Sequence, residues 1–336
     1  MLQRKMADCD VNRPKNDKNA AKERAFTNRS RLPVINPPSR AFVYCCRIVC
    51  VSLVISLYVW EADIQRLIDA LWRYLLTSDF YNHVTFETWW TMLINIPIST
   101  AFYVLTEIPI LQKYKLDPHL PGWQNVGITG VLSESFQYAW PFLFLDFVTV
   151  KKYSGVDASE WALRRQTWLQ STRALPLHAP TLFQICYQLL GAYVIFDAMF
   201  CMVHYTLHRN SWLYKHIHAE HHTHDVLYSK VVNQLTLVER IVLILCANEA
   251  LKIMGSHPLT RTVFVPLFLI NLTENHCGYD LPWTWDKVVP FGLVGGAAKH
   301  WAHHVRGDRY YAPFFTLLDD YVLSKRKTND TKERKY

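Results

Sequence analysis

The sequence contains no Cys-x-x-Cys pair, although its 336 residues include eight cysteines. The cysteines are scattered and most lie inside apolar runs, which excludes the disulfide framework of a small secreted protein. Thiols that stay reduced are typical of a chain whose exposed parts face the cytosol. The sequence also has no internal repeat, which argues against a repeat architecture.

A basic helix face and an aromatic stacking platform are both missing, although the formal net charge is +8. Nucleic-acid binding is therefore not expected. The positive charge lies mainly at the two ends of the chain and beside apolar segments. This distribution suits the anionic lipid of a cytoplasmic membrane leaflet.

The N-terminal region, residues 1–40, lacks hydrophobic periodicity and is polar and basic, so we expect a disordered cytosolic tail. It is too long and too charged before the first apolar run for an ordinary secretory signal. A second basic tail covers residues 324–336. Residues 41–323 are expected to form one membrane-embedded domain between the tails.

Half of the residues are hydrophobic, and they are concentrated in six stretches. The stretches cover residues 42–60, 89–111, 127–150, 180–203, 236–254 and 260–273. The first and fourth are long enough to span the hydrocarbon core of a membrane, which takes about 20 residues. A Gly-Ser-His-Pro turn joins the last two, which predicts a helical hairpin that either spans the membrane or re-enters it. We therefore predict an all-α, polytopic bundle of membrane helices.

The lysine and arginine bias predicts the orientation of this bundle. Both terminal regions are basic, so both termini are expected on the cytosolic side. Four spans before position 204 would return the chain to the cytosol, where a histidine-rich region begins. The helical hairpin would then enter the membrane from the cytosolic side and return to that side before the last histidine cluster.

Three histidine clusters stand out among the fifteen histidines. They are an HxxxH (His204 and His208) and two HxxHH boxes (His218, His221 and His222; His300, His303 and His304). Residues three and four apart share one face of a helix, so each cluster is expected to aim its imidazoles in one direction. Three helical faces would then supply eight imidazoles at the cytosolic edge of the membrane.

Neutral imidazole suits zinc, copper, iron and nickel. A structural zinc site closes with four ligands, so eight histidines indicate two metal ions with open positions for chemistry. His276, at the end of the hairpin, is predicted as a ninth ligand. Asp197 and Glu274 are candidates to accept the outer N–H groups of these histidines. For Asp197, a buried carboxylate satisfied by a neighbouring helix remains an equal alternative. No catalytic residue beyond the ligands is predicted.

With these three boxes in this order, the chain resembles the fatty-acid hydroxylase/sterol desaturase superfamily of membrane di-iron enzymes. Further strings resemble the cholesterol 25-hydroxylase family within it, including His276-Cys277-Gly278-Tyr279 and Tyr311-Ala312-Pro313-Phe314. The resemblance covers roughly residues 89–323. It implies that the domain expected at residues 41–323 is a catalytic domain of this type and that it resides in the endoplasmic reticulum membrane. It also implies two iron ions, O₂ as co-substrate, and electrons from NADPH through cytochrome b5 or a reductase.

The activity implied by the resemblance is hydroxylation of a sterol, with the cholesterol side chain as the expected position. Hydrogen abstraction is common to hydroxylation and desaturation, so the same site would serve a C4-methylsterol oxidase, a sterol desaturase or a fatty-acyl hydroxylase. A non-catalytic membrane protein that binds metal or senses lipid is the alternative from another class.

Overall fold

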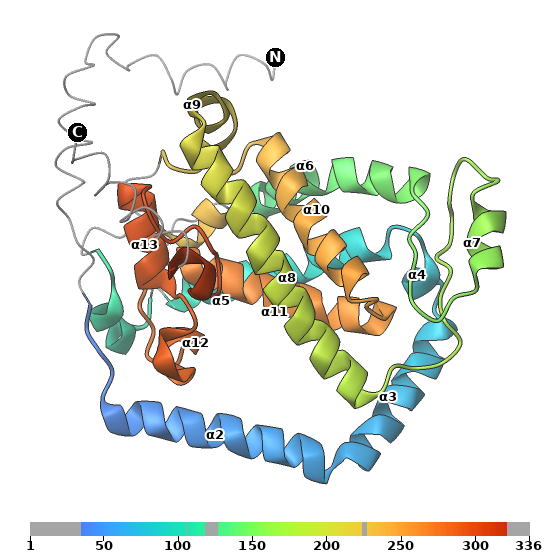
Figure 1. The fold of residues 1–336 in the computed structure, drawn as a ribbon, viewed down its shortest axis with the longest axis horizontal. Coiled ribbons are helices and arrows are strands. Elements are labelled where there is room, and N and C mark those ends of the chain that lie inside the picture. The colour runs from blue at the N-terminus through green and yellow to red at the C-terminus, as the bar shows by residue number, and fades with distance from the viewer. Residues whose placement is uncertain (1–34, 106, 118–126, 224–226, 321–336) are drawn as a thin grey trace, which may run out of the picture.

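The computed structural model describes residues 35–105, 107–117, 127–223 and 227–320. Over these residues the chain is helical, with three isolated β-bridges and no strand. The predicted helical character is therefore confirmed (Figure 1). Both predicted tails lie almost wholly outside the described residues.

Each of the six apolar stretches forms a helix, as the hydrophobic pattern predicts. These helices are α2 (Arg40–Val59), α5 (Phe86–Leu105), α6 (Gly127–Val148), α8 (Leu182–Arg209), α10 (Leu237–Ile253) and α11 (Pro258–His276). Among the described residues, α2 and α8 are long and apolar enough to cross a membrane, and they are the two stretches for which the sequence predicted this.

Shorter elements connect these helices. They are α3 (Glu61–Leu76), α4 (Asp79–Asn82), η1 (Pro109–Tyr114), α7 (Ala158–Arg164), α9 (Ser211–Leu213), η2 (Tyr214–His218), η3 (Ser229–Asn233), α12 (Trp285–Val288), η4 (Pro290–Gly292) and α13 (Ala297–Arg306). Side-chain caps define where the long helices begin. Thr181 and Gln184 form a capping box at the start of α8, and Thr236 caps α10.

Helix α2 lies along one edge of the molecule, and none of its residues is buried (Figure 1). It contacts the rest of the described chain at α12 and α3. Arg47 fixes one of these contacts by donating to the carbonyl of Val288 at 2.9 Å. A helix of this length whose apolar side chains face outward suits an apolar environment such as a lipid bilayer.

The main core lies between α8, α10 and α11. Phe196 of α8 meets Phe268 of α11 edge to face, with ring centroids 4.7 Å apart, and Phe314 of the C-terminal segment packs against both. Gln188 joins α8 to the turn between α10 and α11, because its amide donates to the Gly255 carbonyl at 3.1 Å. This packing brings the C-terminal ends of α8 and α11 close to α13.

Candidate metal centre

Nine histidines converge where α8, α11 and α13 meet. His204 and His208 lie one turn apart near the end of α8, and His276 is the last residue of α11. The third box lies on α13, as the spacing predicts. All nine predicted ligand positions are thus brought together, although the metal itself stays a prediction.

The second HxxHH box departs from the prediction that it lies on one helical face. His218 ends the π-helix η2, and His221 and His222 lie in the turn that follows. In a regular helix these three side chains would share one stripe. His221 lies apart from His218 and His222, so this short segment supplies histidines to two separate groups.

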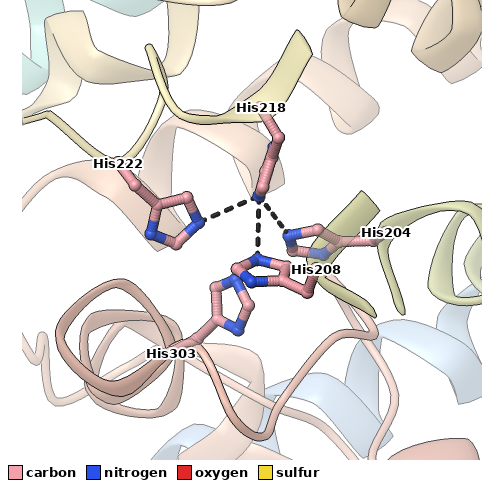
Figure 2. A group of neighbouring side chains, drawn as sticks. All are labelled: His204, His208, His218, His222 and His303. Carbon is pink, nitrogen blue, oxygen red and sulfur yellow. Dashed lines mark hydrogen bonds between the residues drawn. The ribbon is translucent and has the colours of Figure 1, made fainter. Parts of the chain in front are cut away.

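The histidines form two groups, each with its ligand atoms within 4.8 Å of one another. The five-histidine group is His204, His208, His218, His222 and His303; the four-histidine group is His221, His276, His300 and His304. The box on α13 is also divided, because residues four apart share a face more closely than residues three apart. Figure 2 shows the five-histidine group, with its rings pointing toward a common centre.

His218 lies at the centre of the five-histidine group. Its Nε2 atom is 3.0 Å from Nε2 of His204 and 2.9 Å from Nε2 of both His208 and His222. Nε2 of His303 is buried and has no hydrogen-bond partner. In the four-histidine group, the Nε2 of His276 lies 2.9 Å from that of His300 and 3.3 Å from that of His221.

Five of the nine rings have their outer nitrogen, Nδ1, against a backbone carbonyl. A carbonyl only accepts, so each Nδ1 that faces one carries the hydrogen and donates it. The pairs are His204 with Tyr311 (2.7 Å), His303 with Arg309 (2.7 Å), His276 with Leu272 (2.8 Å), and His221 with Gln234 and His222 with His304 (3.3 Å each). In a neutral imidazole with hydrogen on Nδ1, Nε2 carries only a lone pair.

Among these five rings, the bare Nε2 lone pairs of His221 and His276 face each other at 3.3 Å, and those of His204 and His222 face Nε2 of His218 at 3.0 and 2.9 Å. Without a cation between them these atoms repel and lose the hydrogen bonds that water would give, which costs free energy for every unpaired buried group. Cations at the centres of the two groups would remove this repulsion. An all-nitrogen donor set fits iron, zinc, copper or nickel and does not fit magnesium or calcium.

Burial also keeps these imidazoles in the neutral form that binds metal. It lowers the pKa of His222 and of His276 to about 4. Burial, followed by the neighbouring histidines, lowers the pKa of His300, His303 and His304 well below the ordinary value. At neutral pH the ligands need not lose protons before a metal binds.

A carboxylate that the sequence analysis missed supports the central histidine. His218 donates from Nδ1 to Oε1 of Glu239 at 2.6 Å, and both side chains are buried. Such a carboxylate orients a ligating imidazole and raises its basicity.

The two carboxylates that the sequence proposed for this supporting role behave differently. Asp197 accepts hydrogen bonds from the backbone amides of Phe314 (2.7 Å) and Phe315 (3.2 Å), so it fixes the C-terminal segment. Asp197 is thus a buried carboxylate with a structural role, as the alternative proposed, but its partners lie in a non-helical segment and not in a neighbouring helix. The partner of His204 is a carbonyl. For Glu274, the described contacts include no hydrogen bond to a histidine, and burial raises the pKa of its carboxyl to about 7.

A cavity of about 710 Å³ opens onto both histidine groups. His204 and His218 of one group and His221, His276 and His300 of the other line it. Its remaining wall is mostly apolar and comes from α5, α6, α8, α10 and α11. The volume lies within the roughly 300–1,000 Å³ typical of pockets that enclose a small molecule.

Comparisons with known proteins agree with this site. A family model described as fatty acid hydroxylase matches residues 189–324, a range that includes all nine histidines. A Danio rerio protein named cholesterol 25-hydroxylase-like protein is 33% identical over 222 residues, which cover 66% of this chain and 86% of the relative. Cholesterol 25-hydroxylase of Homo sapiens is 26% identical over 261 residues, covering 76% and 88% of the two chains. No solved structure matches. The chain therefore belongs to the fatty acid hydroxylase family, among relatives named for cholesterol 25-hydroxylase.

Proposed function

We propose that the protein is a membrane di-iron oxygenase that hydroxylates a sterol, with the cholesterol side chain as the position of attack. The observation that carries the proposal is the convergence of bare imidazole nitrogens in two groups beside an apolar cavity. The names of the relatives supply the substrate class. The reaction consumes one O₂, two electrons and two protons; one oxygen atom enters the C–H bond of the sterol as a hydroxyl, and the other leaves as water.

A pair of iron ions held by the nine histidines would supply the reductive activation of O₂. The protein's own contribution is geometric. The carbonyls that accept from Nδ1 hold five of the rings in one tautomer, and Glu239 orients His218. Phe200, Phe268 and Leu272 line the cavity beside the histidines, so they exclude water and hold an apolar part of the substrate there.

Residence in a membrane is part of the proposal. We expect α2 and α8 to span the bilayer of the endoplasmic reticulum, in a multi-pass protein with both termini and the histidines on the cytosolic side. The length of the two helices and the basic ends of the chain support this arrangement. Electrons would then come from NADPH through cytochrome b5 or a reductase at the same membrane face.

The test is lipid profiling of cells that express the protein, combined with iron analysis of the purified chain. Wild type is expected to form a side-chain hydroxysterol and to carry two irons, whereas His221→Ala forms no product. His216→Ala is the matched control, because His216 is exposed and belongs to neither group. A changed fatty-acyl pattern without a new oxysterol would contradict the sterol assignment, and one redox-silent zinc would contradict the enzyme.

A further inference from the structure

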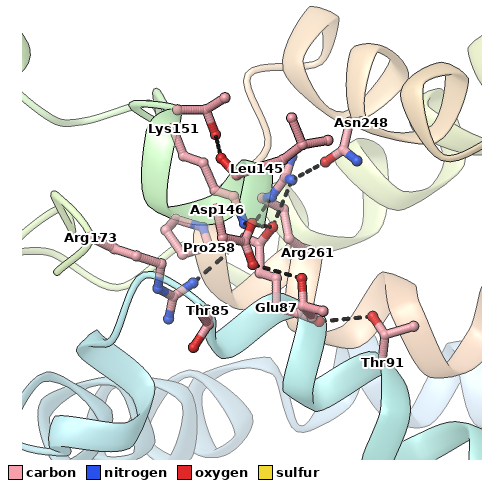
Figure 3. Close-up of polar contacts among 12 residues, drawn as sticks. Thr85, Glu87, Thr91, Leu145, Asp146, Lys151, Arg173, Asn248, Pro258 and Arg261 are labelled. Carbon is pink, nitrogen blue, oxygen red and sulfur yellow. Dashed lines mark hydrogen bonds and ion pairs between the residues drawn. The ribbon is translucent and has the colours of Figure 1, made fainter. Parts of the chain in front are cut away.

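The cavity that reaches the histidines has a second polar wall, formed by a buried charge cluster (Figure 3). The cavity-lining members of this cluster are Glu87, Asp146, Lys151, Asn248 and Arg261, and we call them the head-group cluster. They come from α5, α6, α10, α11 and the segment after α6. The proposed chemistry at the metals uses none of them.

The head-group cluster is held in a fixed geometry. Arg261 donates from Nε and Nη2 to the two carboxylate oxygens of Glu87, at 2.9 Å each, and from Nη2 to Asn248 Oδ1 at 2.5 Å. Lys151 Nζ lies 2.7 Å from Asp146 and 3.3 Å from Glu87. The paired contacts of Arg261 with Glu87 give a directional arrangement that a single point charge would not.

Cations outnumber carboxylates at this place. Lys151 and Arg261, together with Arg173 behind the cavity wall, face Glu87 and Asp146, which leaves one positive charge in excess when all five are ionised. Nη1 of Arg173 is buried without a hydrogen-bond partner. The carboxylates already accept further bonds, from Tyr153 onto Glu87 and from Thr88 onto Asp146. Lys151 and Arg261 also line the cavity, so they present N–H groups from which a ligand oxygen there can accept.

Helix α11 connects this cluster to the metal centre. Arg261 lies near its start and His276 at its end, and the cavity-lining positions between them include Phe264, Phe268 and Leu272. These positions recur at three- and four-residue intervals, so one face of the helix lines the cavity along its length. Fifteen residues at 1.5 Å per residue separate Arg261 from His276 by about 22 Å along the axis. This span is comparable with a sterol measured from its ring hydroxyl to the end of its side chain.

We propose that the head-group cluster binds the ring hydroxyl of the sterol, so that the side chain at the other end of the molecule reaches the histidines. This inference rests on the proposed function and deepens it. The hydroxyl oxygen accepts from the donors of the cluster, and the apolar stripe of α11 packs along the ring system. The arrangement places the carbon farthest from the hydroxyl at the metals. It also holds the ring carbons beside the hydroxyl far from them, which disfavours oxidation of a C4 methyl group.

The experiment measures binding, so that its result does not depend on turnover. The purified full-length chain in detergent is loaded with radiolabelled cholesterol and challenged with unlabelled cholesterol, with cholest-5-ene, which lacks the hydroxyl, or with palmitic acid. A hydrogen bond to a charged group predicts that wild type prefers cholesterol to cholest-5-ene by about 10- to 100-fold. In Arg261→Leu the preference falls to about one.

The preference is a ratio within one preparation, so a smaller folded fraction does not change it. Thr262→Val is the matched control, because Thr262 lies beside Arg261 on α11 but does not line the cavity, and it keeps the preference. Asn248→Ala provides a second variant that leaves the pair between Arg261 and Glu87 intact. It is expected to lower the preference several-fold.

Three results would overturn the inference. Equal binding of both sterols by wild type would show that the hydroxyl is not recognised. Displacement by palmitic acid that depends on Arg261, with no effect of the sterol hydroxyl, would assign the cluster to a carboxylate. Oxidation beside the ring hydroxyl would show the reverse orientation. If this inference held and the proposed function failed, the protein would still bind cholesterol in preference to cholest-5-ene, but it would oxidise no sterol.

Discussion

Replacing Glu239 with alanine tests the metal centre through a residue that would touch no metal. The change removes the acceptor 2.6 Å from Nδ1 of His218, and His218 has three other imidazole nitrogens within 3.0 Å of its Nε2. The buried N–H left behind costs about 1–3 kcal/mol, and the ring is free to rotate or to change tautomer. Loss of such a supporting partner typically lowers metal affinity by roughly 10- to 100-fold.

The assay is competition for Fe(II) between the purified protein and a chelator of known affinity. We expect Glu239→Ala to lose iron at a chelator concentration roughly 10- to 100-fold lower than wild type does. Glu239→Gln should lie between the two, since its amide oxygen still accepts from His218. Glu160→Ala is the control, because Glu160 forms a surface ion pair with Arg164 on α7. Unchanged iron affinity in Glu239→Ala would refute the assignment of His218 as a ligand.

Three further predictions concern stability. Removal of iron should lower the thermal unfolding midpoint of wild type, since it restores the repulsion among the bare nitrogens, and added Fe(II) should reverse the change in a thermal shift assay. Asp197→Ala should destabilise the fold by about 1–3 kcal/mol in denaturant titrations, because two buried amides lose their acceptor; an unchanged midpoint would contradict this. Although burial alone would raise the pKa of Glu87, Arg261 and Lys151 hold it well below its ordinary value of 4.5. The stability that Glu87 contributes is therefore complete above about pH 4.5 and lost as the pH falls below it, so the advantage of wild type over Glu87→Gln should shrink on acidification.

The helices and the histidine boxes could be predicted because their signals are local. Apolar runs of about 20 residues predict α2 and α8, and the Gly-Ser-His-Pro turn predicts the break between α10 and α11. The spacing of His204 and His208 requires only one helical turn to bring them together. None of these inferences depends on how distant segments pack.

Both HxxHH boxes divide in the same way, with the two histidines four apart in one group and the middle histidine in the other. Helical spacing allows this division, but which group each histidine joins depends on how α8, α11, α13 and the turn at His218–His222 pack, and spacing does not give that packing. The role of Glu239 beside His218 could not be predicted, because the local sequence around Glu239 indicates a different role. Thr236 and Glu239 have the spacing of a capping box, in which the glutamate turns back to the helix start. Here Thr236 does cap the Glu239 amide at 3.2 Å, but the carboxylate reaches His218.

Because both HxxHH boxes are divided between the two groups, the two proposed metal positions would depend on the same backbone segments. The segment from His218 to His222 supplies both groups, and so does the turn of α13 from His300 to His304. A metal that orders one group therefore fixes the backbone that presents ligands to the other, and loading should be cooperative. A preparation with an average of one iron per chain would then be largely a mixture of empty and doubly loaded molecules. Its specific activity would rise in direct proportion to its iron content.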